Sequence, residues 1–490
     1  MDNHSTYQRR KTHPIQVGRT LIGGDNPIII QTMTNTPTLD TEATVSQIVR
    51  CVEAGAKLVR MTAQGVTHAA NLANIRNALN DRNVEVDLVA DIHFNPAAAF
   101  EAANHVEKVR INPGNFVDPG RVFKTIDYTD SEYAGELQRL RDAFVPFLDL
   151  CRKNGTAIRI GVNHGSLSDR IMSRYGDTPN GMVESAMEFL RIARDHNFSD
   201  IVISIKSSNV VVMTQTVRLL AETMAKEDMD FPIHLGVTEA GDGEDGRVKS
   251  AVGIGSLLAS GLGDTIRVSL SEAPEAEIPV AQAIIDHVNK ISKGEPMFTI
   301  KEYERLLPSG SPSPYVVGID SEERYGRIHT FVFPADMNLE QLTIAASVNI
   351  GWALLNDQVD GIEVVAPGVS NEDLKRLILN ILQATRKRIT KTEYIACPGC
   401  GRTLFDLSAT LHAVREVTSH LKGLKIGVMG CIVNGPGEMA DADYGYVGGA
   451  KNRVSLYRGK ECVSKNLSPE EAISALIELI KTDGRWVDPS

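Results

Sequence analysis

Short apolar runs rich in β-branched residues recur through the first part of the chain, and each is followed by a polar or glycine-containing corner. Amphipathic stretches such as TEATVSQIVRCVEAGA and MVESAMEFLRIARDHN lie between them and have apolar positions at helical spacing. The runs lie at residues 27–34, 57–62, 87–94, 108–115, 157–165, 201–208, 232–241 and 265–272. This strand–helix alternation predicts an N-terminal (β/α)8 TIM-type barrel, with a doubly wound open sheet as the alternative because periodicity does not show closure.

The pattern changes near residue 291, where a stretch rich in Pro, Ser and Gly is typical of a linker. Three strand-like and two helix-like runs follow it and carry no chemical motif. The C-terminal part mixes strands and helices and holds four of the 6 cysteines. We therefore predict three domains: a barrel at 1–290, a short α/β insert domain at 291–385, and an α+β domain that carries these cysteines at 386–490.

The composition is that of a soluble globular protein, with 42% hydrophobic and 23% charged residues. The net charge of −11 argues against a nucleic-acid or anionic-membrane partner. The sequence contains no apolar run long enough to span a membrane and no signal-like N-terminus. Six cysteines in 490 residues do not form a disulfide framework, so we expect a cytoplasmic protein.

Ionisable and amide side chains stand near the ends of the predicted strands, where a barrel carries its active site. They are Arg60, Asp91, His93, Arg110, Asn112, Arg159, Asn163, Lys206, Glu239, Arg267 and Ser269. Rim ion pairs would explain any one of the cations, but Asp91 and Glu239 are too few to offset all of them. Because guanidinium groups match phosphate oxygens, the surplus predicts a small phosphate or diphosphate ligand.

Three cysteines of the C-terminal part are spaced as metal ligands. EYIACPGCGRTLFD places Cys397 and Cys400 on a Pro-Gly turn, and GCIVNGPGE places Cys431 in a glycine-rich loop. Cys462 could complete a structural zinc site, although zinc ribbons usually carry a second closely spaced pair. The alternative is a 4Fe–4S cluster with three thiolates and one exchangeable non-cysteine ligand such as Glu438. The spacing favours iron–sulfur and leaves zinc open.

Several segments together carry a resemblance to a known family. They are RINPGN, RIGVNHGSLSDR, HLGVTEAG, GDTIRVSL, CPGCGRTLFD and GCIVNGPGE. They resemble the signature segments of the 4-hydroxy-3-methylbut-2-enyl diphosphate synthases, reductive iron–sulfur enzymes of the non-mevalonate isoprenoid pathway. The long connection at 118–150 resembles the larger plant-like and chlamydia-like branch, although the insert here is shorter than the middle domain of that branch.

The resemblance implies a reaction, a cofactor and a partner. The reaction is the two-electron reductive ring opening and dehydroxylation of 2-C-methyl-D-erythritol 2,4-cyclodiphosphate to (E)-4-hydroxy-3-methylbut-2-enyl diphosphate. The cofactor is a 4Fe–4S cluster, and the electron donor is ferredoxin or flavodoxin, with ferredoxin expected from the plant-like resemblance. We also expect a homodimer, and the sequence leaves open whether barrel and cluster domain meet within one chain or across two.

The resemblance also assigns roles to residues. It implies that the cluster ligands are Cys397, Cys400, Cys431 and Glu438. It implies that the substrate contacts are Arg60, Arg110, Arg159, Asn163, Lys206, Arg267, Ser269 and Asn434. Cys462 falls outside the family pattern and is expected to be an ordinary thiol. A proton must reach the departing oxygen or carbanion, and the candidates for donating it are Glu239 first, then Asp91 and His93.

Two other functions stay open at this point. An iron–sulfur hydro-lyase would remove water without net reduction and would need no electron donor. A zinc-stabilised binding protein would catalyse nothing and would contain no iron.

Overall fold

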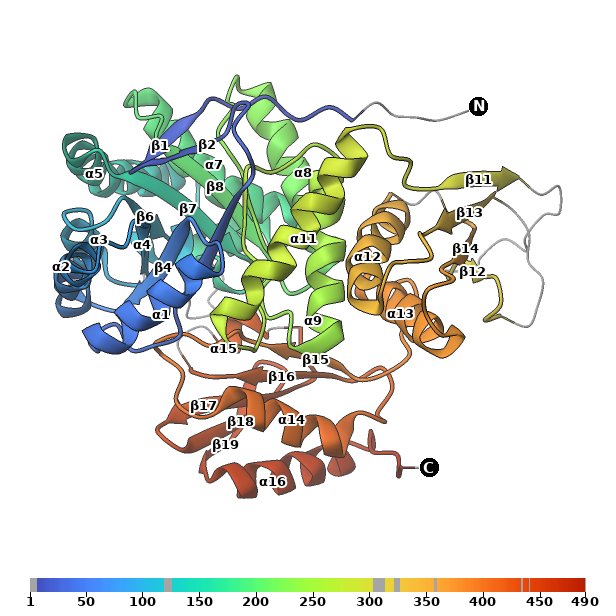
Figure 1. Ribbon diagram of the computed structural model, residues 1–490. Coiled ribbons are helices and arrows are strands. Elements are labelled where there is room, and N and C mark those ends of the chain that lie inside the picture. The colour runs from blue at the N-terminus through green and yellow to red at the C-terminus, as the bar shows by residue number, and fades with distance from the viewer. Residues whose placement is uncertain are drawn as a thin grey trace.

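The computed structural model describes residues 7–118, 126–302, 313–320, 327–356, 359–432, 435–439 and 441–489. None of the helices within these ranges has the length and apolar character of a membrane span. Figure 1 shows the N-terminal barrel with a smaller α/β layer at its side and a separate C-terminal sheet below it.

Eight parallel strands form the central sheet, in the order β8-β7-β6-β5-β4-β3-β10-β9. They are β3 (Ile29–Met33), β4 (Leu58–Ala63), β5 (Asp87–Ile92), β6 (Lys108–Ile111), β7 (Ala157–Asn163), β8 (Ile201–Lys206), β9 (His234–Leu235) and β10 (Thr265–Ile266). A parallel bridge between Ile203 and Ile233 joins the two ends of this order and closes the ring. Seven strands fall inside predicted runs and β4 ends one residue past its run, so the barrel is confirmed and the open-sheet alternative is wrong.

Helices surround the ring because their apolar faces cover the outward side chains of the strands. They are α1 (Thr41–Glu53), α2 (Val66–Asp81), α3 (Pro96–Ala102), α4 (Pro113–Phe116), α5 (Asp130–Asn154), α6 (Asp169–Tyr175), α7 (Pro179–Asp195), α8 (Val210–Lys226), α9 (Gly243–Ser250), α10 (Ser256–Ala259) and α11 (Pro274–Ser292), with the turns η1 (His164–Ser166) and η2 (Ala251–Gly255). The long connection at 118–150 leads into α5, which starts at a capping box between Thr129 and Glu132.

A hairpin of β1 (Ile15–Val17) and β2 (Thr20–Ile22) closes the bottom of the barrel. Its buried side chains share a small apolar cluster with residues near the start of four barrel strands, Leu58, Val89, Ala157 and Val202. The carboxylate of Asp87 accepts hydrogen bonds from the backbone N–H groups of Arg19 and Thr20 and thereby ties the hairpin turn to β5.

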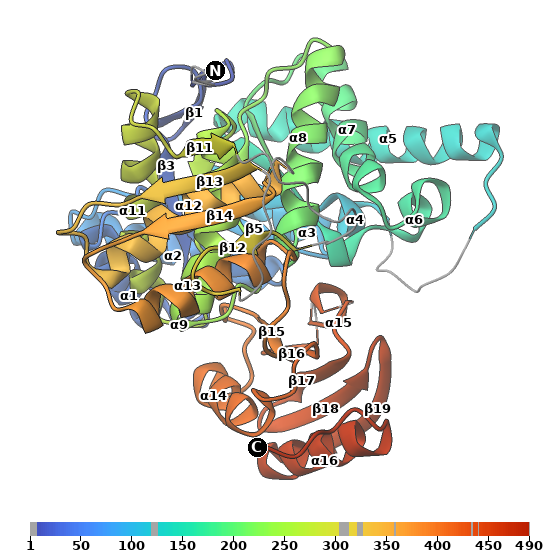
Figure 2. The same ribbon diagram turned by 90° about the vertical axis from the view of Figure 1, so that its right-hand side faces the viewer.

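The middle segment adds a four-stranded sheet and two helices beside α9 and α11 (Figures 1 and 2). Its elements are β11 (Thr299–Glu302), β12 (Tyr315–Val316), β13 (Arg327–Val332), α12 (Leu339–Leu355), β14 (Gly361–Val365) and α13 (Asn371–Ala384). The predicted linker is wrong at β11, because Thr299–Glu302 pairs antiparallel with β13 as an edge strand. The helix α12 packs on η2, and its apolar residues belong to the barrel core.

The C-terminal part is a five-stranded sheet with its own apolar core. Its elements are β15 (Glu393–Ala396), α14 (Leu407–Thr418), β16 (Lys425–Met429), α15 (Gly435–Glu438), β17 (Tyr444–Ala450), β18 (Arg453–Arg458), β19 (Glu461–Leu467) and α16 (Pro469–Thr482). Ser468 caps α16 through a capping box with Glu471. In Figure 2 the short helix α15 rises from this sheet toward the barrel, so the loops that follow β15 and β16 face the barrel.

Candidate active site

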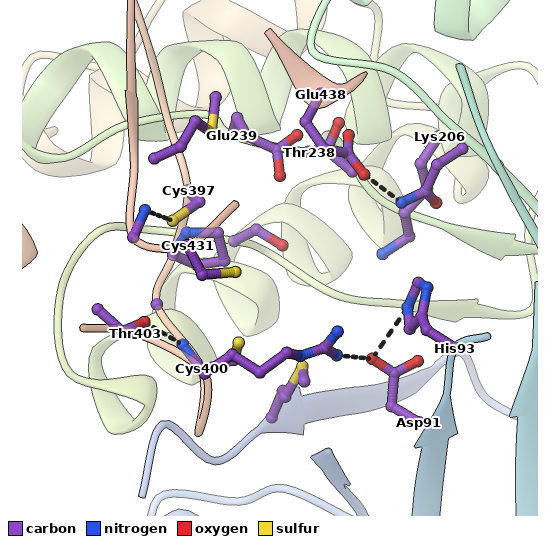
Figure 3. A pocket seen from close by; sticks show the side chains of 18 of the residues that line it. Asp91, His93, Lys206, Thr238, Glu239, Cys397, Cys400, Thr403, Cys431 and Glu438 are labelled. Atoms are coloured by element: carbon purple, nitrogen blue, oxygen red, sulfur yellow. Dashed lines mark hydrogen bonds and ion pairs between the residues drawn. The ribbon is translucent and has the colours of Figure 1, made fainter. Parts of the chain in front are cut away.

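The carboxyl ends of the barrel strands and the cysteine-bearing loops of the C-terminal part face each other across a cavity of about 110 Å³. Figure 3 shows Cys397, Cys400 and Cys431 on one side of this cavity and Lys206 and Asp91 on the other. The predicted site residues that line it are Arg60, Asp91, His93, Arg110, Arg159, Asn163, Lys206, Glu239, Arg267, Ser269, Cys397, Cys400, Cys431 and Glu438. One chain therefore brings together residues from both predicted halves of the site.

Two asparagines singled out in the sequence stand apart from this set. Asn112 caps the short helix α4, accepting the Gly114 N–H at 3.1 Å and donating to Ser166 Oγ at 2.9 Å. Its position at a strand end therefore serves local structure. Asn434 lies outside the described residues, and its contact with substrate stays a prediction.

Two of the rim arginines have carboxylate partners. Arg110 donates to Asp91 at 2.9 Å and also contacts His93, while Arg267 donates to Glu277 at 3.1 Å. Although burial favours its neutral form, the guanidinium groups around Asp91 hold its pKa well below the usual range. Burial, aided by Arg110, lowers the pKa of His93 to about 3, so this ring is neutral near pH 7. These pairs hold Arg110 and Arg267 in fixed orientations at the mouth.

The other rim cations have much weaker partners. Arg60 points two N–H groups at the thioether sulfur of Met33, at 3.1 and 2.8 Å, and a thioether is a poor acceptor. Arg159 donates to Ser204 Oγ at 2.6 Å, while its Nε and Nη2 have no acceptor among the described residues. Burial and the neighbouring arginines lower the pKa of Lys206 well below its usual range. The rim thus concentrates positive charge that its carboxylates do not offset, which favours a polyanionic ligand.

Glu239 lies between the cationic rim and the cysteine loops. Its φ of 50° is unusual for a residue with a side chain, and backbone strain of this kind concentrates at functional sites. Burial and the facing carboxylate of Glu438 raise the pKa of Glu239 well above its usual range. Asn163 donates to Glu438 from the barrel side. Burial therefore favours the protonated form of Glu239, and its role as proton donor stays a prediction.

The cysteine turn is held by local hydrogen bonds. Cys397 Sγ accepts the Gly430 N–H at 3.3 Å, and the Cys400 N–H donates to Thr403 Oγ1 at 3.0 Å. Gly399 has a φ of 74°, which lets the Pro-Gly turn fold tightly between the two thiols. Burial raises the pKa of the Cys397 thiol to about 12, and a bound metal would reverse that preference.

Arg402 and Met33 are among the lining residues of this cavity that the sequence reasoning missed. Arg402 reaches from the cysteine turn to Asp91 at 3.4 Å, and although burial opposes it, Cys400 and Asp91 raise its pKa. Met33 accepts the Arg60 contacts described above and lines the cavity. The signal for Arg402 was present, because it directly follows the cysteine motif. Met33 gave no such signal, because a methionine at the end of a buried strand usually belongs to the hydrophobic core.

The donor set suits a cluster better than a single ion. Within the described ranges, no three His, Cys, Asp or Glu side chains converge as the ligands of one metal ion would. Cys397, Cys400, Cys431 and Glu438 instead border a shared cavity, and a four-iron cluster needs one ligand for each iron. Cys462 donates to the Ser464 carbonyl in β19 and does not line the cavity. This geometry argues against a zinc site with four cysteine ligands.

The two halves touch backbone to backbone where η1 meets α15. A Cβ atom added to Gly165 in η1 would lie 1.9 Å from the carbonyl oxygen of Gly437 in α15. A parallel bridge between Ala240 and Ala396 forms a second contact between the halves. Closure of the cavity therefore depends on glycine at the contact between η1 and α15.

The variant Gly165→Ala should lower turnover by roughly 100-fold, because the methyl group would push α15 away and misplace its carboxylate. The barrel itself should stay folded, since the severe clash is with the C-terminal part. Steady-state kinetics together with the thermal unfolding midpoint test this expectation. Gly135→Ala in α5 is the matched control, because its added Cβ would meet nothing within 4 Å. Equal turnover in the two variants would contradict the closure contact.

Comparison with known families matches most of the chain. The GcpE TIM-barrel domain matches residues 12–282, and the GcpE protein C-terminal domain matches residues 393–482. The two matches cover the barrel and the cysteine-bearing part, and the middle segment between them is matched by neither.

Curated relatives match over nearly their full length. A 4-hydroxy-3-methylbut-2-en-1-yl diphosphate synthase (flavodoxin) from Bacteroides fragilis is 47% identical over 605 residues, covering 98% of this chain and 97% of the relative. The enzyme of the same name from Parabacteroides distasonis is 46% identical, covering 98% of this chain and 99% of the relative. Another from Leptospira interrogans is 38% identical, covering 99% and 98%. These alignments are longer than this chain of 490 residues, so the relatives carry segments that have no counterpart here.

Proposed function

The chain belongs to the GcpE family, and on that premise we propose that it is a 4-hydroxy-3-methylbut-2-en-1-yl diphosphate synthase that uses flavodoxin as its electron donor. Its substrate is 2-C-methyl-D-erythritol 2,4-cyclodiphosphate. The observation that carries the proposal is the single cavity with a cationic barrel mouth on one side and three cysteines with Glu438 on the other.

The barrel rim binds the diphosphate. The guanidinium groups of Arg110 and Arg267, fixed by Asp91 and Glu277, form charge-assisted hydrogen bonds to its oxygens. Arg60, Arg159 and Lys206 offer donors that weak or absent protein acceptors leave available. When the ring opens, one end of the diphosphate leaves carbon while the other stays attached, so the same rim holds substrate and product.

The cysteine side holds the cofactor. Cys397, Cys400, Cys431 and Glu438 would be the four ligands of a 4Fe–4S cluster. When bound, such a cluster supplies electrons singly and a Lewis-acidic iron with an exchangeable ligand. Two electrons enter in all, one C–O bond of the ring breaks, and a hydroxyl group departs as water. Glu239 supplies a proton on this side of the cavity, because burial favours the protonated form of its carboxyl group.

The proposed donor is flavodoxin in place of the ferredoxin expected from the plant-like resemblance, because the relatives described above carry flavodoxin in their names. The homodimer stays a prediction. A second copy is not needed to complete the cavity, since residues of one chain line both of its sides.

Anaerobic metal and sulfide analysis, followed by turnover of the cyclodiphosphate with and without reduced flavodoxin, tests this function. We expect iron and sulfide in cluster stoichiometry and product only when the reductant is present. Water loss without reductant would identify the hydro-lyase, and zinc without iron would identify the binding protein. Either result would overturn the proposal.

A further inference from the structure

Lys108 lies one layer deeper in the barrel than the cationic rim. It precedes Arg110 by two residues on β6, and alternate residues of a strand point to the same side, so both side chains face the barrel interior. Branched apolar residues usually fill these interior layers. A lysine at this depth is therefore unusual and needs an explanation.

The amine of Lys108 is buried and unpaired. The residue is 0% exposed, and its Nζ has no hydrogen-bond partner among the residues that the structure describes. It does not line the substrate cavity. Two other polar side chains of the barrel interior also lie outside the cavity lining and have polar atoms without hydrogen-bond partners among the described residues. Gln31 is unpaired at both amide atoms, and His234 is unpaired at Nε2. No acceptor among the described residues lies within hydrogen-bonding distance of the Lys108 amine, as a buried ammonium group would require.

The charged groups around Lys108 oppose its protonation. Arg159 on β7 and Arg60 on β4 are positive, and His234 on β9 offers no negative charge. Asp87 on β5 is the nearby carboxylate, but hydrogen bonds from the β1–β2 hairpin already occupy it. Burial and the fields of Arg159 and Arg60 lower the pKa of Lys108 well below its usual range.

We propose that Lys108 is an uncharged amine while the cavity is empty and accepts a proton from solvent when the diphosphate binds above it. The inference rests on the proposed function, because the arriving charge is that of the substrate. The negative charges of the diphosphate offset Arg60 and Arg159, and the same interior then favours an ammonium group. Substrate capture therefore takes up a proton. Lysine suits this role because its protonation responds to burial, whereas arginine keeps its charge.

The sign of the pH dependence follows from this coupling. Binding raises the pKa of Lys108, so uptake occurs at pH values between its pKa in the empty protein and its pKa in the complex. Within that window the affinity for substrate falls as pH rises, by up to tenfold per pH unit for one proton. Outside the window Lys108 contributes no pH dependence. Lys108 is thus a positioning residue that adjusts the charge beneath the substrate.

Isothermal titration of the anaerobic holoenzyme with the cyclodiphosphate, in buffers of different ionisation enthalpy, measures the protons exchanged. Each phosphorus of this ligand carries one strongly acidic oxygen, so the ligand exchanges no proton of its own near neutral pH. We expect Lys108→Met to take up fewer protons than the wild type, by up to one per substrate. The slope of log Kd against pH should be shallower by the same amount.

Gln31→Leu is the matched control, because Gln31 is buried and unpaired in the same interior but does not titrate. Its proton uptake should equal that of the wild type. Lys206 lines the cavity and its pKa is also lowered, so any proton uptake by Lys206 is common to all variants and the readout is the difference between them. Equal uptake in Lys108→Met and wild type would overturn the inference. If Lys108→Met does not fold, the wild type alone provides the test: no proton uptake on substrate binding at any pH would also overturn the inference. Failure of the cyclodiphosphate to bind at all would instead refute the proposed function.

Discussion

Replacing Cys397 with serine should give a folded protein that contains no cluster and has no detectable turnover. The side chain packs at the edge of the C-terminal core, and a serine hydroxyl can still accept the Gly430 N–H, so the fold loses little. A hydroxyl is a far poorer ligand for iron than a thiolate, because iron–sulfur clusters are held by soft thiolate ligands. Iron and sulfide content, visible absorption and activity of the anaerobically purified variant measure the effect.

Cys462→Ser provides the control for this variant. Its thiol lies in β19 of the same C-terminal part, donates to the Ser464 carbonyl and does not line the cavity. It should keep its iron, its colour and its activity. Loss of iron in Cys462→Ser, or full iron content in Cys397→Ser, would contradict the ligand assignment.

The barrel half of the site could be predicted because parallel strands that form a ring bring their carboxyl ends to one mouth. Knowing that Arg60, Arg110 and Arg159 each stand near a strand end was enough to place them together. Their partners could not be read in the same way. Glu277 lies in α11, and its contact with Arg267 depends on how that helix packs against the ring. Such contacts depend on packing between elements and leave no periodic trace in the sequence.

The relation between barrel and C-terminal part lay beyond the sequence, which left open whether the two meet within one chain. In this structure they do, through Gly165 against Gly437 and through Arg402 against Asp91. Neither contact has a local signature, because each joins segments far apart in the chain.

The sequence of the middle segment indicates that one of its helices is buried on several faces. The helix α12, which contains LTIAASVNIGWALL, is apolar on nearly all sides, and such a helix must be buried on more than one face. Val348 packs against Gly255 and Gly351 against Val252, so α12 lies in the barrel core and its sheet covers the other side. The expected insert is therefore continuous with the barrel in its packing.

Arg159→Met should stabilise the empty protein and weaken substrate binding at the same time. Arg159 is 1% exposed and has one hydrogen bond among the described residues, to Ser204, while burial and the neighbouring arginines oppose its charge. Replacing buried charges with apolar side chains of similar volume often stabilises a fold, and we expect about 2 kcal/mol after the loss of the Ser204 bond. Losing a charge-assisted contact to the diphosphate should weaken binding by roughly 100-fold. Thermal unfolding without substrate and titration with the cyclodiphosphate measure the two effects.

The control is Arg141→Met, which removes an exposed pair with Asp195 and should change unfolding by no more than about 0.5 kcal/mol. It should leave binding unchanged, because Arg141 lies on the outer face of α5. The opposite signs at Arg159 are the distinguishing result, since a purely structural arginine would destabilise the fold on removal. If Arg159→Met lowers stability, its charge is already compensated in the empty protein. If binding is unaffected, Arg159 does not contact the anion. An arginine that opposes folding and favours binding is the behaviour expected of a residue kept for its ligand.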